Sequence, residues 1–415
     1  MRRIAFLGCM AAAVAAGGAG RAADWPQFGG PGRNMVSPER GLLRAWPAGG
    51  PRVLWTVPLG KGYGGAAVVG RDVYLLDRDD KDILKCLDLG TGAVQWTFAY
   101  EAPGKLAHPG SRQVPTVSAA SVFTIGPFGH LHGVDRAAHR PVWKRHLLED
   151  WGGALPRWGV AQAPLLYKDA VIVAPQSGSV GLVALDQATG RERWRSGPIG
   201  AMRYVSPTLV SVAGADQVVM QSGSEVAGLD ASTGKILWTY KYACRNAIPH
   251  PTPVGDGGFF ITGGYDAGSD LVRVVRAGGG FAVRRLWRHP DMGSQIHQPF
   301  LIQGFLYALC NTNDRADGMA CFASDGTVRW QTKRDPYLCR GNGILTGDGL
   351  LYQMDGASGE LYIIEPRPEG FRALSKAPLL GGREIWAPMA LSDGKLVLRD
   401  QHQMKCIQVR GPPEL

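Results

Sequence analysis

The chain has 415 residues and a formal net charge of +10 at pH 7, and 45% of its residues are hydrophobic while only 19% are charged. Its 58 glycines and 28 prolines indicate many turns, and the apolar fraction excludes a disordered chain, so a turn-rich β protein is favoured. The positive charges are scattered, with no run of five lysines or arginines, which argues against nucleic-acid binding.

Residues 1–22 have the pattern of an export signal. Arg2 and Arg3 precede an apolar stretch over residues 4–16, and small residues follow up to Ala22. This order predicts a cleaved Sec-type signal peptide and a mature protein that is periplasmic or secreted. The apolar stretch is too short to cross a bilayer, and no later segment has 18 consecutive apolar residues, so no membrane span is expected.

After a lead-in segment over residues 23–52, one ten-residue phrase returns along the chain. In the copy from Leu185 to Trp194, Asp186 and Thr189 can hydrogen-bond the local backbone, and Gly190 can take the positive φ of a tight turn. The phrase therefore predicts a strand, a turn and a strand. The clear and degenerate copies span residues 87–96, 134–143, 185–194, 229–238 and 321–330.

Each copy also contains apolar runs of strand length ahead of the phrase, such as residues 163–167, 170–174 and 181–185. Together these segments predict four short strands per copy, which is the blade of a β-propeller. Seven tryptophans from Trp55 to Trp330 recur at intervals of 41 to 51 residues. A four-stranded blade must bury its faces against its neighbours, so we expect these large flat side chains to fill the space between blades.

The repeats over residues 53–410 divide best into eight copies. The strand expected at residues 53–57 stands alone, whereas the last copy stops after three strands, so one blade is expected to combine both ends of the chain and close the ring. The fold class predicted is therefore all-β, a single eight-bladed propeller closed by N-terminal and C-terminal strands. The copy over residues 341–380 lacks the tryptophan phrase, so seven blades is the alternative.

Six cysteines follow the export signal, and none forms a Cys-x-x-Cys pair, so neither a zinc site nor covalent haem is expected. Two readings fit Cys310 and Cys321. They form a disulfide across adjacent strands in an oxidising compartment, or most of the cysteines are small buried thiols inside the blades.

The strand phrase resembles that of the pyrroloquinoline-quinone-like (PQQ-like) propeller repeat family, and the resemblance covers about residues 24–409. Its members include quinoprotein alcohol dehydrogenases and a propeller of the outer-membrane barrel-assembly machinery. The opening over residues 24–33 is similar to the lead-in of a large exported subset. This resemblance implies the fold, but the repeated residues build blades and name no activity.

Quinoprotein dehydrogenases, as the resemblance implies, hold their quinone between an aromatic floor and a disulfide of two adjacent cysteines, with calcium bound by Glu, Asn and Asp. This chain has no Cys-Cys dipeptide, and eight blades leave no long insertion to cover a cofactor. No cofactor and no metal are therefore expected. PQQ with calcium is expected only if the chain is an oxidoreductase with a reduced site.

A short segment rich in polar and aromatic residues precedes the innermost strand expected in each blade. Equivalent loops of a propeller open on one face, so these segments should form one mouth around the central channel, with at least five arginines. Such a mouth favours an anionic or planar ligand, although polar residues at a channel entrance also serve simply to satisfy the backbone. The residues expected there are Tyr63, Arg112, Arg157, Trp158, Gln162, Arg203, Tyr204, Arg245, His250, His297, Arg340, Asn342 and Trp386.

Three functions fit these features. The prediction is a non-catalytic binding or scaffold protein of the cell envelope, whose partner is an envelope protein, an acidic glycan or a small anionic ligand. The first alternative is a PQQ-dependent oxidoreductase of the alcohol or sugar dehydrogenase type. The second is a hydrolase or lyase of acidic polysaccharide that uses His108, His250 or His297 as acid or base.

Overall fold

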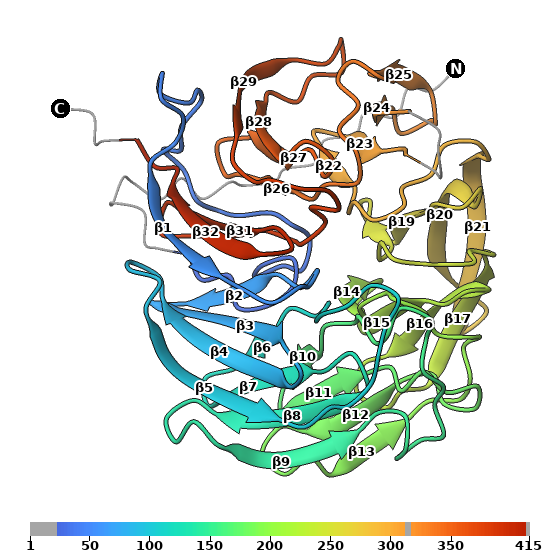
Figure 1. The fold of residues 1–415 in the computed structure, drawn as a ribbon. Coiled ribbons are helices and arrows are strands. Elements are labelled where there is room, and N and C mark those ends of the chain that lie inside the picture. The colour runs from blue at the N-terminus through green and yellow to red at the C-terminus, as the bar shows by residue number, and fades with distance from the viewer. Residues whose placement is uncertain (1–22, 312–316, 412–415) are drawn as a thin grey trace, which may run out of the picture.

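The computed structural model describes residues 23–311 and 317–411. The predicted signal peptide lies outside the described residues and stays a prediction. All the regular elements described are β-strands, and they form eight four-stranded antiparallel sheets arranged around a central axis (Figure 1). No helix among the described residues is long and apolar enough to cross a membrane.

The first four sheets follow the chain and are numbered here as blades, each from its innermost strand outward. Blade 1 has β2 (Ala66–Val69), β3 (Asp72–Arg78), β4 (Asp82–Asp88) and β5 (Val94–Tyr100). Blade 2 has β6 (Thr116–Val117), β7 (Ser121–Ile125), β8 (His130–Asp135) and β9 (Pro141–His146). Blade 3 has β10 (Leu165–Tyr167), β11 (Ala170–Val173), β12 (Val183–Asp186) and β13 (Glu192–Arg195). Blade 4 has β14 (Thr208–Val212), β15 (Ala215–Gln221), β16 (Glu225–Asp230) and β17 (Ile236–Lys241).

The other four sheets complete the ring. Blade 5 has β18 (Thr252–Pro253), β19 (Gly258–Gly263), β20 (Gly268–Ala277) and β21 (Gly280–His289). Blade 6 has β22 (Phe300–Ile302), β23 (Phe305–Leu309), β24 (Met319–Phe322) and β25 (Val328–Gln331). Blade 7 has β26 (Gly343–Leu345), β27 (Leu351–Met354), β28 (Glu360–Ile364) and β29 (Ala373–Pro378). Blade 8 has β30 (Ala390–Ser392), β31 (Lys395–Arg399), β32 (Gln403–Gln408) and β1 (Val53–Pro58).

Blade 8 closes the ring with both ends of the chain. Strand β1 pairs antiparallel with β32, with Thr56 opposite Lys405, and Figure 1 shows the blue β1 beside the red β32. The copy without the tryptophan phrase forms the complete blade 7. The prediction of eight blades closed by terminal strands is therefore confirmed, and the seven-blade alternative is wrong.

The repeated phrase forms the turn before the outermost strand, as predicted. In blade 3 the Asp186 carboxylate accepts hydrogen bonds from the Ala188 and Thr189 amides and from the Thr189 hydroxyl at 2.8 to 3.1 Å. The hydrogen bond from Arg193, followed by those from Thr189, lowers the pKa of Asp186 to about 2. Gly190 takes a φ of 67° and closes the turn.

The phrase also interlocks neighbouring blades. Trp143 of blade 2 donates its indole N–H to the Gln187 carbonyl of blade 3 at 2.8 Å, and its ring lies against Gly190, where a Cβ would come within 2.7 Å. The same contact between ring and glycine joins Trp55 to Gly92, Trp194 to Gly234 and Trp287 to Gly326. Tryptophan thus fills the space between blades, as predicted, and only a residue without a Cβ lets it approach so closely.

The degenerate copy in blade 2 keeps this contact by another route. His139 stands where the clear copies have glycine, adopts a φ of 56°, and stacks on Trp96 of blade 1 with ring centroids 4.7 Å apart. Trp238 departs from the pattern, because its indole N–H donates to Gln217 of its own blade at 2.7 Å. Blade 5 has an extended β20–β21 hairpin in place of the phrase, so no matching turn faces this ring.

The lead-in segment crosses one end of the central channel. This is the end at which the innermost strands of the blades finish. Trp25 pairs with Val68 of blade 1, and Val36 pairs with Leu345 of blade 7, each the last or next-to-last residue of its inner strand. Arg33 donates to the Pro164 carbonyl of blade 3 at 2.8 Å. Blades 3 and 7 face each other across a ring of eight, so residues 33–36 lie near the axis and close this end of the channel.

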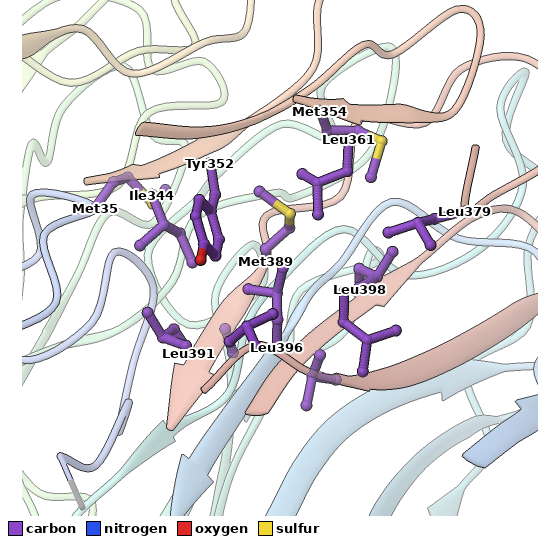
Figure 2. Close-up of a cluster of buried hydrophobic side chains, with 14 of the residues drawn as sticks. Met35, Ile344, Tyr352, Met354, Leu361, Leu379, Met389, Leu391, Leu396 and Leu398 are labelled. Carbon is purple, nitrogen blue, oxygen red and sulfur yellow. The ribbon is translucent and has the colours of Figure 1, made fainter. Parts of the chain in front are cut away.

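The lead-in also joins the hydrophobic core. Figure 2 shows Met35 beside Ile344 and Tyr352 of blade 7, with Leu391 and Leu396 of blade 8 nearby. All these side chains are buried, and the Tyr352 hydroxyl donates to the Leu43 carbonyl at 2.6 Å. The segment is thus held by apolar burial at two blades at once.

All six described cysteines are buried free thiols. A Cys310–Cys321 disulfide, one of the two readings, is therefore not formed. Cys321 stands opposite Tyr307 in the β23–β24 ladder, whereas Cys310 follows β23 and its N–H bonds the Gly318 carbonyl. The register thus places the two residues at different levels of the blade. The other reading, small thiols inside the blades, agrees with the structure.

Candidate functional site

The loops that precede the inner strands surround a cavity of about 240 Å³ at the entrance of the central channel, called here the mouth cavity. Six of the predicted residues line it, and they come from six of the eight blades. They are Tyr63, Arg112, Trp158, Tyr204, Asn342 and Trp386.

Aromatic rings form most of the wall. Tyr63 stacks on Trp386 with centroids 5.4 Å apart and planes inclined by 27°, and Trp158 stacks on Tyr204 at 5.0 Å and 29°. Tyr265 lies 6.3 Å from Trp158. Phe28 of the lead-in also lines the cavity, so the segment that closes the far end of the channel supplies the floor.

Close backbone contacts between adjacent blades hold these loops in place. The Tyr63 amide donates to the Ser111 carbonyl of the neighbouring loop at 2.7 Å. A Cβ on Gly64 would come within 2.4 Å of the Gln113 carbonyl oxygen, and one on Gly65 within 2.2 Å of the Pro388 oxygen. Because Gly64 and Gly65 have no Cβ, the loops before blades 1, 2 and 8 can pack closely against one another. This packing fixes the position of Tyr63.

A small polar cluster lies on one side of the cavity. The Tyr63 hydroxyl donates to Glu384 Oε2 at 2.7 Å, and His108 Nδ1 lies 3.3 Å from that hydroxyl and 3.7 Å from the carboxylate. Burial, followed by the bond to Glu384, raises the pKa of Tyr63 well above its ordinary value. Tyr63 is therefore neutral, and its hydroxyl proton is donated in the hydrogen bond to Glu384.

Arg112 is the cation of the mouth cavity. Its guanidinium donates to the Gly110 carbonyl at 2.7 Å and to the His108 carbonyl, and it lies 5.3 Å from the centre of the Tyr63 ring. Burial lowers the pKa of Arg112 from 12.5 to about 10, so it keeps its charge at neutral pH. Within the described part of the chain, no carboxylate forms an ion pair with it.

Three further predicted arginines gather beside the cavity rather than inside it. Arg157, Arg203 and Arg245, from the loops before blades 3, 4 and 5, line a second hollow of about 210 Å³, called here the rim hollow. Trp158 and Tyr204 line both spaces, so the two adjoin. Arg203 is held by bonds to the Arg245 and Met202 carbonyls at 3.1 and 3.0 Å.

Four predicted residues line neither space: Arg340 and three residues that are almost fully buried. Gln162, His250 and His297 are almost fully buried, two or three residues before the inner strands β10, β18 and β22 begin. His297 Nε2 lies 3.0 Å from Gln353 Oε1, and the His250 backbone amide donates a hydrogen bond to Gln298 Oε1 at 3.2 Å. Burial lowers the pKa of both histidines to about 3. Both histidines thus lie away from the two spaces, and neither has the exposure that an acid or base acting on polysaccharide needs.

The arginines expected in one funnel are divided between the two spaces. Arg112 alone among the described arginines lines the mouth cavity, three others line the rim hollow, and Arg340 lines neither. Conversely, sequence reasoning missed Phe28 and Tyr265 as lining residues, whereas Gln295, which also lines the cavity, lies in one of the segments expected at the mouth. Tyr265 belongs to the β19–β20 turn, and Phe28 reaches the cavity from the opposite end of the channel, so neither lies in a segment before an inner strand.

The lining does not fit a calcium–quinone pair. Calcium takes six to eight oxygen ligands, most often with carboxylates among them. The described lining contains no Asp or Glu, and the nearby Glu384 already accepts the Tyr63 hydroxyl. Arg112 would repel a divalent cation in the same space.

Comparisons with known proteins agree with this architecture. The model of a family described as outer membrane protein assembly factor BamB matches residues 79–332. The assembly factor BamB of Shewanella oneidensis is 23% identical over 277 residues, which cover 66% of this chain and 65% of that protein. The match thus spans just under two thirds of that relative's length.

Solved structures are similar in fold. BamB from Moraxella catarrhalis superposes with a TM-score of 0.61 at 16% identity, over 88% of this chain and 99% of that one. A europium-containing methanol dehydrogenase gives 0.63 at 12% identity, over 93% and 89%. The quinohemoprotein alcohol dehydrogenase of Comamonas testosteroni gives 0.63 at 14% identity, over 94% and 81%. At these identities the likeness shows the propeller fold alone.

Proposed function

The chain belongs to the family of the outer membrane protein assembly factor BamB, and on that premise we propose that it is a non-catalytic binding and scaffold protein of the cell envelope. The predicted signal over residues 1–22 would deliver it there. Its binding site is the mouth cavity, which takes an acidic ligand or an acidic segment of a partner.

One observation carries this proposal: an open cavity walled by aromatic rings and containing the half-buried charge of Arg112. Concave sites with apolar walls and few oriented polar groups are where proteins bind ligands. A buried guanidinium favours an anion, because the low dielectric around it strengthens their attraction. The related BamB proteins are named for outer membrane protein assembly, which favours an envelope protein as the partner of this chain.

Site-specific photo-crosslinking in cells that export the full chain tests the binding site. A photoreactive residue is placed at Arg157, on the mouth rim, and as a control at Val142, which is 49% exposed on the outer strand β9. We expect a defined adduct from position 157 that Trp158→Ala weakens, and none from position 142. Equal adducts from both positions, or none from either, would contradict the proposal.

An activity assay on the purified protein tests the oxidoreductase alternative. PQQ and calcium are added with a primary alcohol and a dye acceptor, and dye reduction is followed. Because the lining lacks carboxylates for calcium, we expect no turnover above the protein-free control. Reproducible turnover that Trp158→Ala abolishes would overturn the non-catalytic assignment.

A further inference from the structure

We propose that the mouth cavity and the rim hollow form one continuous site for an acidic glycan, with a uronic acid unit in the cavity and the anionic group of the next unit at the rim. This inference rests on the proposed function and names the ligand of that site. It follows from four features of the two spaces.

The first feature is the pair of ring stacks in the cavity wall. Tyr63 with Trp386, and Trp158 with Tyr204, form stacked pairs from neighbouring blades, and all four residues line the cavity. The negative face of an aromatic ring attracts the partially positive C–H hydrogens on the face of a pyranose. A sugar ring therefore fits these walls, whereas an extended acidic peptide has no comparable flat C–H face.

The second feature is Arg112. Its guanidinium has five N–H groups, and the described bonds to the Gly110 and His108 carbonyls leave the others for a ligand. The planar fork of arginine matches the two oxygens of a carboxylate. No carboxylate of the described residues pairs with Arg112. A carboxylate on the sugar would therefore supply the missing counter-charge.

The third feature is an acceptor in the cavity lining. Gln295 is 9% exposed, and its Nε2 donates to the Tyr265 hydroxyl at 2.7 Å, while its Oε1 accepts no hydrogen bond from the described residues. A buried acceptor left without a donor costs about 1 to 3 kcal/mol. A ligand hydroxyl would satisfy it, so the cavity suits a polyhydroxylated acid better than a simple aromatic acid.

The fourth feature is the rim hollow. Arg157, Arg203 and Arg245 come from three successive blades, and the hollow adjoins the cavity along Trp158 and Tyr204. A ligand that leaves the cavity past these two rings meets three cations. The site therefore favours an oligomer with an acidic group on the next unit over a single acidic sugar.

Isothermal titration calorimetry on the full mature chain tests this inference with four probes: galacturonate, trigalacturonate, neutral maltotriose and a hexaglutamate peptide. We expect trigalacturonate to bind at least about tenfold more tightly than galacturonate, and maltotriose and hexaglutamate not to bind detectably. Arg112→Gln should weaken both uronides by about tenfold to hundredfold, the range for a hydrogen bond to a charged group.

Matched variants separate charge from folding. Arg112→Lys keeps the positive charge, so it should retain more binding than Arg112→Gln if the variants fold alike by near-ultraviolet circular dichroism. The triple change Arg157→Gln, Arg203→Gln and Arg245→Gln should bring trigalacturonate down to the affinity of galacturonate. Arg273→Gln, an exposed arginine on β20 of blade 5, is the control and should leave binding unchanged.

Two results would overturn the inference. If the uronides bind equally to wild type and to Arg112→Gln, or fail to bind, the glycan assignment is wrong. If hexaglutamate binds instead, and Arg112→Gln abolishes that binding, the ligand is an acidic peptide and the proposed function survives without the glycan. The proposed function itself fails on the crosslinking result or on PQQ-dependent turnover, neither of which uses a glycan, so the two failures are distinguishable.

Discussion

At the residue scale, the interlocking of blades depends on glycines that tolerate both a positive φ and an adjacent indole. Gly234 has a φ of 72° and would place a Cβ 2.4 Å from Trp194 of the preceding blade. Gly214 in the same blade has a φ of 78° with nothing within 4 Å. The two positions therefore separate the cost of the backbone conformation from the cost of displacing the tryptophan.

We expect Gly214→Ala to lower the free energy of unfolding by about 1 kcal/mol, the cost of a left-handed backbone with a Cβ. Gly234→Ala should lower it by about 1 to 3 kcal/mol more, because the ring must also move. Urea unfolding of both variants and of wild type, followed by tryptophan fluorescence, measures the difference. Equal losses in the two variants would show that the blades do not depend on this contact.

The buried histidines make stability depend on pH. Burial holds the pKa of His297 at about 3, against an ordinary value of 6.5. Below pH 6.5 His297 is protonated in the unfolded chain, whereas in the folded chain it stays neutral down to about pH 3. The free energy of unfolding therefore falls as the pH is lowered through this range. The expected slope is about 1.4 kcal/mol per pH unit for each such histidine.

His297→Gln should therefore flatten the decline of the unfolding free energy between pH 6 and pH 4.5 by about that amount, since glutamine does not titrate. Urea unfolding at several pH values gives the slope. His402→Gln, at an exposed histidine, serves as the control and should leave the slope as it is in wild type. A slope that is the same in all three proteins would contradict the assignment of His297 as a buried neutral group.

Residue types at the mouth could be predicted from the sequence, but side-chain directions could not. Tyr63, Trp158 and Trp386 line the cavity as expected, because the loop before each inner strand must open on the same face. Gln162 and His297 lie in the same segments yet point into the blades, since a difference of a few residues turns a side chain from the channel toward the core. Sequence spacing carries no information on where each loop begins to turn.

At the scale of elements, the lead-in segment closes the end of the channel opposite the mouth cavity. Trp25 is 1% exposed and exchanges two backbone hydrogen bonds of 2.8 Å with Val68. The segment has no β-strand of its own, so its order depends on such side-chain anchors. The sequence predicted a lead-in over residues 23–52, but nothing in its pattern indicated that it crosses the axis, because the contacts lie on blades remote in the chain.

Trp25→Ala should release this segment from the ring. We expect amide hydrogen exchange over residues 24–36 to become at least about tenfold faster, measured by mass spectrometry, with little change in the outer strands. Arg44→Ala is the control within the same segment, because its exposed ion pair with Glu365 contributes little. Unchanged exchange after Trp25→Ala would mean that the lead-in is held by contacts other than this anchor.

The blades themselves were predictable as elements. The phrase with Asp, Thr and Gly closes the turn before the outermost strand wherever it occurs, since local hydrogen bonds and one positive φ suffice to form it. Blade 7 was harder to predict, because β28 and β29 are joined without that phrase. Its strands depend on burial against blade 8, which is a property of the assembled ring.

At the scale of the whole molecule, eight similar blades produce one site because their loops meet at a single entrance. The strand β1 completes blade 8 and brings the start of the chain to its end, so the ring has no unpaired gap. The repeat length predicted this closure. The composition of the entrance could not be predicted as well, because it depends on which of several arginines lines the mouth cavity, and Arg112 alone among the described ones does.

Fluorine NMR of the full chain labelled with 5-fluorotryptophan tests the central claim most directly. The chain has 12 tryptophans, and Trp158 and Trp386 line the mouth cavity, whereas seven others from Trp55 to Trp330 recur with the blades. Signals are assigned with Trp158→Phe and Trp386→Phe, and trigalacturonate and hexaglutamate are then titrated separately. We expect the signals of Trp158 and Trp386 to shift with whichever probe binds, while those of the tryptophans between blades stay in place. Saturable binding that leaves both mouth signals unmoved and shifts others would contradict the claim that the mouth of the propeller is its binding site.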